Sequence, residues 1–299
     1  MKIFFDPIYA HPLPENHRFP MQKYELIPQQ LLHEGTIEDS EIIKPDTCKN
    51  ETILRIHSSE HVEKMDRLGF SASEQRAIGF PQSPQLMHRE KIITQGTIDA
   101  CGVAFREGVA LNIAGGTHHA FRDRGEGFCI LNDMAVAAQY LIDHALAKQI
   151  VIIDLDVHQG NGTASIFANE KKVFTLSMHG AHNYPFRKEK SDLDIALLDG
   201  TDGKTYLQLL DKHLPEVLQQ IQPDAAFYLS GVDVLETDKF GKLRLTLEDC
   251  KERDEYVFRL LEKNNIPVVV AMGGGYSPNI KTIVEAHCNT FRVARKLYG

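Results

Sequence analysis

Short apolar runs alternate with longer amphipathic segments along most of the chain. The short runs predict buried β-strands, and the longer segments have the three-to-four-residue period of helices. We expect strands at residues 2–5, 41–44, 110–114, 150–155, 173–178, 225–230 and 267–272, and helices at residues 21–34, 58–68, 89–108, 133–147, 163–168, 204–220, 246–262 and 278–297. This alternation is typical of a parallel sheet with helices on both faces. Residues 71–84 contain two prolines and predict an irregular surface loop near the mouth of a site.

The predicted strand at residues 150–155 combines a strongly apolar start with a polar end. Asp154, Asp156 and His158 stand at i, i+2 and i+4, so their side chains leave the same face if the chain stays extended. Charged groups are rarely buried unless they are paired or bound to a metal. We therefore favour a bound cation over the alternative, a solvated strand end with an aspartate that caps the next helix.

Polar clusters also follow three other predicted strands. His118 and His119 come after the third strand, Asp233 after the sixth, and Tyr276, preceded by three glycines, after the seventh. Taken singly, such residues are often ordinary turn or cap residues. Because the carboxyl ends of parallel strands share one edge of the sheet, all four clusters can meet in one crevice. The glycines match neither G-x-x-x-x-G-K-[ST] nor G-x-G-x-x-G, so close approach of the backbone to a site explains them better than phosphate binding.

The polar triplet also indicates which metal is expected. Two aspartate oxygens and one histidine nitrogen, with a position open to water or substrate, fit a catalytic site for one zinc ion, although Mn²⁺ and Fe²⁺ accept the same ligands. The pattern alone does not decide between Asp154 and Asp156 as the ligand.

Composition and charge narrow the class of protein further. The chain has 299 residues, 42% of them apolar, and no linker or repeat, so we expect one domain over residues 1–299. The net charge of −8 argues against nucleic acid as a partner and weakly favours a cationic substrate. Five scattered cysteines without a C-x-x-C pair predict reduced thiols in a cytoplasmic protein. We expect neither a signal peptide nor a membrane span.

The ordered set of motifs resembles the zinc-dependent histone deacetylase family. These motifs are G-G-x-H-H, G-F-C, D-L-D-V-H-Q-G-N-G, G-x-D and G-G-G-Y, and the similarity extends over about residues 11–283. The segments D-R-G-E-G-F-C, H-N-Y-P and G-V-D-V-L-E-T-D make the chain most similar to the class IV branch. The resemblance implies a three-layer α/β/α fold of the arginase/deacetylase type, with a central, mainly parallel sheet of eight strands.

The resemblance also implies roles for individual residues. It makes His119 the general base and then the general acid, and Tyr276 the donor to the oxyanion. The implied zinc ligands are Asp156, His158 and Asp233; the catalytic residues are His118, His119, Tyr276, Asp154 and Asn161; and the substrate-binding residues are Gly127, Phe128 and Gly274. A structural potassium ion is implied at Asp154, Asp156, His158, Ser177 and Met178.

The implied reaction removes acetyl groups, and also longer fatty acyl groups, from lysine side chains of proteins or peptides. One alternative is a deacetylase of acetylpolyamines or other acylated small amines. A manganese ureohydrolase of arginase type is less compatible, because it needs a second D-x-D pair where this chain has only Asp233. A non-catalytic scaffold is disfavoured because every catalytic position is filled.

Three departures from class I members of the family affect these expectations. Asn161 replaces a carboxylate behind the second histidine, which predicts a lower pKa for His119. The loop at residues 179–185 lacks a phenylalanine pair, which leaves the second wall of the substrate tunnel unassigned. Within residues 71–84, Glu74 is the only acid available to hold a peptide backbone.

Overall fold

A parallel sheet of eight strands runs through the molecule in this computed structural model, which describes all 299 residues. The strands are β1 (Lys2–Phe4), β2 (Ile42–Ile43), β3 (Val109–Asn112), β4 (Ile150–Asp154), β5 (Val173–Gly180), β6 (Leu193–Leu197), β7 (Ala225–Leu229) and β8 (Val268–Ala271). Their order across the sheet is β2-β1-β3-β8-β7-β4-β5-β6, and every neighbouring pair is parallel. The predicted α/β class and the eight strands are therefore confirmed.

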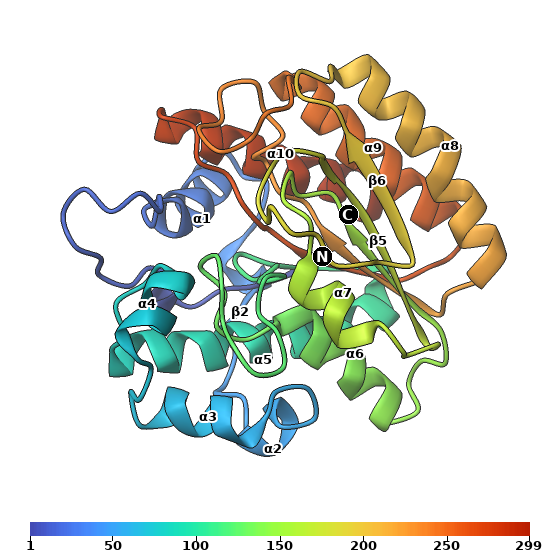
Figure 1. Cartoon of the computed structure of the whole chain (residues 1–299). Coiled ribbons are helices and arrows are strands. Elements are labelled where there is room, and N and C mark those ends of the chain that lie inside the picture. Colours follow the sequence, from blue (N-terminus) through green and yellow to red (C-terminus); the bar gives the residue numbers. More distant parts are fainter.

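Helices cover both faces of the sheet and make the three layers that the alternation predicts. The helices are α1 (Lys23–His33), α2 (Asn50–Ile53), α3 (Ser59–Asp66), α4 (Ala72–Ile78), α5 (Pro84–Glu107), α6 (Asp133–Asp143), α7 (Asn161–Phe167), α8 (Gly203–Ile221), α9 (Leu247–Lys263) and α10 (Ile280–Tyr298). In Figure 1, α1, α8, α9 and α10 lie on one side of the sheet, and α5 and α6 lie on the other. None of the helices is both long enough and apolar enough to cross a lipid bilayer.

The central strands owe their position to their apolar sequences. Every residue of β3, β4, β7 and β8 is buried, as expected for strands covered by helices on both faces. The edge strand β6 instead alternates between buried and exposed residues. Pairing across the sheet aligns Asn112, Ala271, Leu229 and Asp154, so the chain leaves four adjacent strands at the same level.

Three elements differ from the sequence-based expectation, and one of them is the short helix α2, which the pattern did not predict. Residues 71–84 are not an irregular loop, because α4 occupies Ala72–Ile78. Ser71 and Glu74 form a capping box at its start, a helix signal that the two prolines obscured. Strand β6 was not expected from the pattern, although Leu193, Ile195 and Leu197 have the period of two that marks an edge strand.

Candidate active site

The four polar clusters predicted from the sequence meet at one edge of the sheet. The strands that precede them, β3, β8, β7 and β4, are consecutive in the sheet. Side chains that follow β3, β4 and β8 line one inner cavity of about 40 Å³, among them His118, His119, Asp156, His158 and Tyr276. Asp233, which follows β7, is outside this lining and reaches the site through its contact with His158. This is the carboxyl edge at which parallel α/β sheets bind ligands.

Three of these side chains form a group that could hold a metal ion. One ligand atom each from Asp156, His158 and Asp233 lies within 4.8 Å of the others, and all three residues are buried. The Nδ1 atom of His158 is 3.1 Å from Asp156 Oδ1 and 3.1 Å from Asp233 Oδ2. The ligand atoms therefore face a common point.

Main-chain N–H groups hold the two carboxylates in place. His158 N donates to Asp156 Oδ1 at 2.9 Å, and Val157 N donates to Asp233 Oδ1 at 2.9 Å. Gly274 N donates to the other oxygen of Asp156 at 2.8 Å. A side chain at Gly274 would collide with Asp233, so this glycine lets the backbone approach the cluster. Gly274, expected at the substrate, thus contacts an implied metal ligand.

The charges of the cluster fit a divalent cation. Burial lowers the pKa of an imidazole, yet the carboxylates of Asp156 and Asp233 raise the pKa of His158 to about 10. Burial and the neighbouring Asp156 raise the pKa of Asp233 to about 7. The pocket therefore stabilises positive charge at its centre, and two carboxylates with one imidazole are ligands that zinc accepts.

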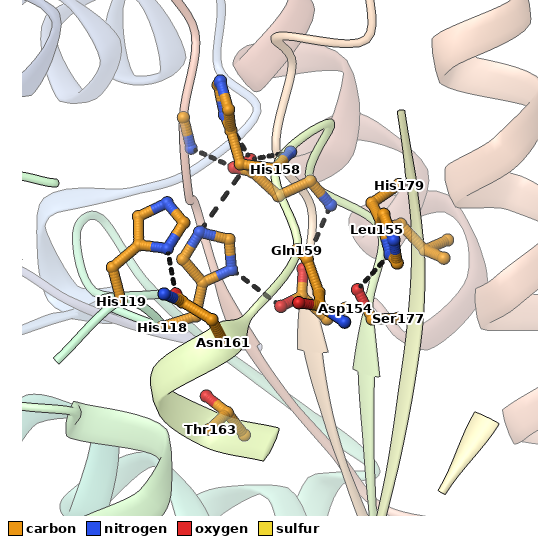
Figure 2. Close-up of polar contacts among 12 residues, drawn as sticks. His118, His119, Asp154, Leu155, His158, Gln159, Asn161, Thr163, Ser177 and His179 are labelled. Carbon is orange, nitrogen blue, oxygen red and sulfur yellow. Dashed lines mark hydrogen bonds and ion pairs between the residues drawn. The ribbon is translucent and has the colours of Figure 1, made fainter. Parts of the chain in front are cut away.

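The adjacent histidines have different partners (Figure 2). His118 Nδ1 lies 2.7 Å from Asp154 Oδ2, and His119 Nδ1 lies 2.6 Å from Asn161 Oδ1. Although burial lowers the pKa of His118, the charge of Asp154 raises it above the ordinary value. Burial and the charges of His118 and His158 hold the pKa of His119 well below its ordinary value. Carboxylate and amide partners thus separate two neighbouring imidazoles into a more basic and a less basic one.

Tyr276 is anchored through its backbone. Its N–H donates to Asp238 Oδ2 at 2.6 Å, and the other oxygen of Asp238 accepts from the N–H groups of Phe240 and Gly241. The Tyr276 ring lies 6.4 Å from the His158 ring, measured between centroids. Burial and the charge of Asp233 raise the pKa of Tyr276 well above its ordinary value, so the hydroxyl keeps its proton. The sequence pattern did not single out Asp238, whose only signal is its place in the loop after Asp233.

Aromatic rings line the approach to these groups. Phe128 has a left-handed backbone with φ 68°, a conformation rare for a bulky residue and frequent at functional sites. The segment Gly127–Phe128 is held to the end of α4, because the two N–H groups donate to the carbonyls of Ala77 and Ile78. The unassigned second wall contains Tyr184, whose ring packs edge-on against His119 at 4.9 Å between centroids.

A wider outer cavity of about 700 Å³ leads to the same groups. It is lined by Phe128, Tyr184, Tyr276, His119 and His158, among others. Four of these, all except Tyr184, also line the inner cavity, so the two cavities adjoin around the same side chains.

A buried lysine lies behind the site and was also missed by sequence analysis. Lys23 is fully buried in α1, and its Nζ donates to the carbonyl of Gly273 at 2.9 Å. It lies on the same helix face as the buried Ile27 and Leu31. A charged residue on the apolar face of a helix is unusual, so the sequence did contain a sign that Lys23 has a special role. Lys23 stabilises the glycine-rich turn that carries Gly274 and Tyr276.

The residues implied for potassium lie in two neighbouring strands and in the turn after β4. Ser177 pairs with Asp154 in the register of β4 and β5, and Met178 follows it; both are buried. The Ser177 hydroxyl lies 3.0 Å from His179 Nδ1 (Figure 2). The potassium site stays a prediction.

Solved structures identify the fold class. An HDAC homolog from Aquifex aeolicus matches with a TM-score of 0.83 at 25% sequence identity, over 97% of this chain and 82% of that one. The fold is therefore of the arginase/deacetylase type that the resemblance implied.

Sequence comparisons identify the family. A family model described as the histone deacetylase domain matches residues 17–291. An uncharacterized protein from Picosynechococcus sp. is 40% identical over 296 residues, 99% of each chain, and Histone deacetylase 2 of Arabidopsis thaliana is 28% identical over 277 residues, 90% of this chain and 72% of that one. The chain belongs to the histone deacetylase family and is a hydrolase of the deacetylase type. Membership of the class IV branch stays a prediction.

Proposed function

We propose that this chain is a zinc-dependent amidohydrolase that removes acyl groups from lysine side chains of proteins or peptides. The observation that carries the proposal is the group of Asp156, His158 and Asp233 at the inner end of a cavity that also contains His119 and Tyr276. One zinc ion per chain would be held by these three side chains. A potassium ion would be held by Asp154, Asp156, His158, Ser177 and Met178 and would have a structural role in the β4–β5 region.

Two uncharged groups perform the proton chemistry in this proposal. Because its pKa is lowered, His119 is neutral near pH 7; it accepts a proton from the attacking water and then donates it to the departing amine. Tyr276 donates a hydrogen bond to the oxyanion that forms on the acyl carbon. Asp154 balances the charge of the neighbouring His118, and Asn161 orients the ring of His119. A bound zinc ion supplies polarisation of the acyl carbonyl and acidification of the attacking water.

The cavity dimensions support acetyl as the preferred acyl group. A cavity needs about 10–15 Å³ to hold one water molecule, so the inner cavity of about 40 Å³ suits a group of roughly three heavy atoms. Phe128 and Tyr184 suit the lysine methylenes, and Gly127 lets His119 pack closely against this segment. Longer fatty acyl groups require the inner walls to move, and we propose them as secondary substrates.

Two alternatives use the same site. A deacetylase of acetylpolyamines or other acylated small amines would share every catalytic residue proposed here. A manganese ureohydrolase of arginase type receives less support, because Asp156, His158 and Asp233 are the only metal-binding group of this kind in the chain. We propose no nucleic-acid partner and no association that requires a membrane span.

A panel of acyl-lysine peptides tests the proposal. The zinc-loaded protein is assayed with acetyl-, octanoyl- and myristoyl-lysine peptides of one sequence, with chelator-treated protein as the control. We expect turnover of the acetyl peptide, weaker turnover of the longer ones, and loss of both on chelation. If no peptide is hydrolysed by protein with full zinc occupancy, the proposed function is wrong.

The location and extent of the protein are also proposals. All five cysteines are buried and unpaired, which supports a cytoplasmic location with reduced thiols. The eight strands share one sheet and one large core cluster, which supports a single catalytic domain over residues 1–299.

A further inference from the structure

The mouth of the site has the opposite charge from the rest of the chain. Overall, 41 acidic residues exceed 33 basic ones and give a net charge of −8. The outer cavity instead has four basic side chains and one acidic side chain in its lining: Arg18, Arg76, Lys239 and Lys242 against Glu126. A local reversal of sign around a concave site raises the local concentration of ligands with the opposite charge.

The one acidic side chain in this lining, Glu126, already accepts hydrogen bonds from two groups within the chain. Glu126 Oε1 accepts from Arg124 Nε at 2.8 Å, and Glu126 Oε2 accepts from the Tyr184 hydroxyl at 2.9 Å. Its charge is therefore balanced by Arg124, outside the lining, and it does not offset the cations at the mouth.

Three of the four cations have no acidic partner within the chain. Arg18, Arg76 and Lys239 are exposed, and no carboxylate oxygen lies within the 4.0 Å of an ion pair from any of them. Lys242 is the exception, since its Nζ is 3.4 Å from Asp199. The chain has acids in excess yet leaves these three positive charges free around one cavity.

Aromatic rings hold Arg18 at the neck of the site. Its guanidinium carbon lies 5.0 Å from the centre of the Phe128 ring and 5.7 Å from that of Phe240. Phe240 in turn packs against Tyr276 at 5.0 Å between centroids. Cation–π contacts keep a guanidinium charged and leave its N–H donors free for a carboxylate. Arg18 is thus a fixed anion receptor beside the entrance that the acylated amine must pass.

We propose that the mouth selects acylated lysines that carry a carboxylate at or beside the lysine backbone, at the opposite end of the side chain from the acyl group. Arg18 would bind that carboxylate, and Arg76 and Lys239 would attract it to the mouth. This inference rests on the proposed deacylase function and specifies its substrate class. The carboxylate comes either from acidic residues beside an acyl-lysine in a peptide or from the α-carboxylate of a free acylated amino acid.

The same charges disfavour one alternative function. An acetylpolyamine carries ammonium groups where the proposed substrate carries a carboxylate, so three unpaired cations would repel it. The net charge of the whole chain weakly favoured a cationic substrate, but the local charge of the mouth points the other way.

Matched substrates test the proposal. Three acetyl-lysine peptides differ only in the residues on either side of the lysine, which are Asp, Ser or Lys. A second arm compares free Nε-acetyl-lysine with its α-amide. The zinc-loaded protein is assayed for kcat/KM at low salt and at about 0.15 M salt. We expect the Asp peptide to exceed the Lys peptide by about tenfold or more at low salt, with a smaller ratio at high salt.

Paired variants assign the preference to the mouth. Arg76→Gln with Lys239→Gln removes two of the free cations, and the Asp-to-Lys ratio should then fall severalfold. Lys148→Gln with Lys171→Gln removes the same charge from exposed positions outside the lining of either cavity and should leave the ratio unchanged. An equal fall in both pairs would mean that net charge sets the preference, and the proposal would be wrong.

Binding measurements separate failure of this inference from failure of the proposed function. Fluorescence anisotropy with chelator-treated protein, in which turnover is not expected, gives the Kd of each labelled peptide. Preferential binding of the Asp peptide supports the inference even if turnover is absent, in which case the proposed function alone fails. A preference confined to free Nε-acetyl-lysine over its amide also supports it and identifies the α-carboxylate as the source. Equal binding in both arms overturns the inference, including where all substrates are hydrolysed.

Discussion

The floor and the mouth of the candidate active site are built in different ways. At the floor, Asp156, His158 and Asp233 are buried, and main-chain N–H groups at the strand ends hold the carboxylates. At the mouth, Arg76 and Lys239 are exposed and have no acidic partner. The floor therefore has one geometry fixed by the sheet, whereas Arg76 and Lys239 present charge at the mouth without ion pairs that hold them in place.

This difference predicts how each region responds to substitution. Removing one partner of a buried, hydrogen-bonded charge pair destabilises a protein by on the order of 3–5 kcal/mol, because the other charge is left unpaired. An exposed charge contributes only about 0–1 kcal/mol to an ion pair. Changes at the floor should therefore abolish activity, and changes at the mouth should only adjust it.

The largest effect is expected for Asp233→Ala. The substitution removes one of three proposed ligands, so zinc content should fall to background and turnover should fall on the order of 10⁴-fold. Metal analysis of the purified protein and an acetyl-peptide assay measure the two effects. Asp46→Ala, at an exposed aspartate whose side chain makes no hydrogen bond, is the matched control. Full zinc occupancy in Asp233→Ala would contradict the ligand assignment.

A smaller effect at the floor is expected for Tyr276→Phe. The backbone bond to Asp238 is kept, so the change isolates the hydroxyl. Loss of one oxyanion donor should reduce kcat on the order of a hundredfold or more while zinc content stays intact. Tyr140→Phe, which removes a hydroxyl without a hydrogen-bond partner outside both cavities, is the control. Unchanged kcat would remove Tyr276 from the mechanism.

The floor could be predicted from the sequence because its residues follow strands directly. Asp156 and His158 keep the period of two beyond β4, and Asp233 follows β7 after a short turn. Strand ends that share one edge leave few arrangements for such residues. Pairing of distant segments decides which strands are neighbours, and the sequence pattern does not contain that order. The placement of β8 and β7 between β3 and β4 came from the structure.

The mouth could not be predicted in the same way. Its residues come from loops and from the end of α4, where no period marks which side chains face the cavity. Tyr184 and Arg18 reach the site only because the chain folds back over it, and α4 itself was mistaken for a loop. The resemblance to the histone deacetylase family identified Phe128 as one wall of the substrate tunnel, but it identified no residue for the opposite wall.

The pH dependence of activity tests whether the pKa of His119, at the floor, can be changed without loss of activity. His119 faces the amide of Asn161, and burial with two positive neighbours lowers its pKa, so wild-type activity should persist below pH 6.5. In Asn161→Asp, the carboxylate would favour the imidazolium form and raise the pKa of His119. The acid limb of kcat/KM should then move to higher pH by about one unit, with little change above pH 8.

The control for this prediction is Asn169→Asp, which adds the same charge at an exposed position. It should leave the pH profile unchanged. An unchanged profile in Asn161→Asp itself would mean that His119 is not the group whose protonation limits the reaction.

The smallest effect is expected for Tyr184→Phe at the mouth, which removes the same single oxygen as Tyr276→Phe. The hydroxyl of Tyr184 donates only to the partly exposed Glu126, while its ring stays packed against His119. A hydrogen bond of this kind contributes about 1 kcal/mol, so kcat/KM should change by less than about fivefold, and mainly through KM. If the loss instead equals that of Tyr276→Phe and lies in kcat, the mouth is as tightly coupled to the chemistry as the floor. The contrast between the two regions would then be wrong.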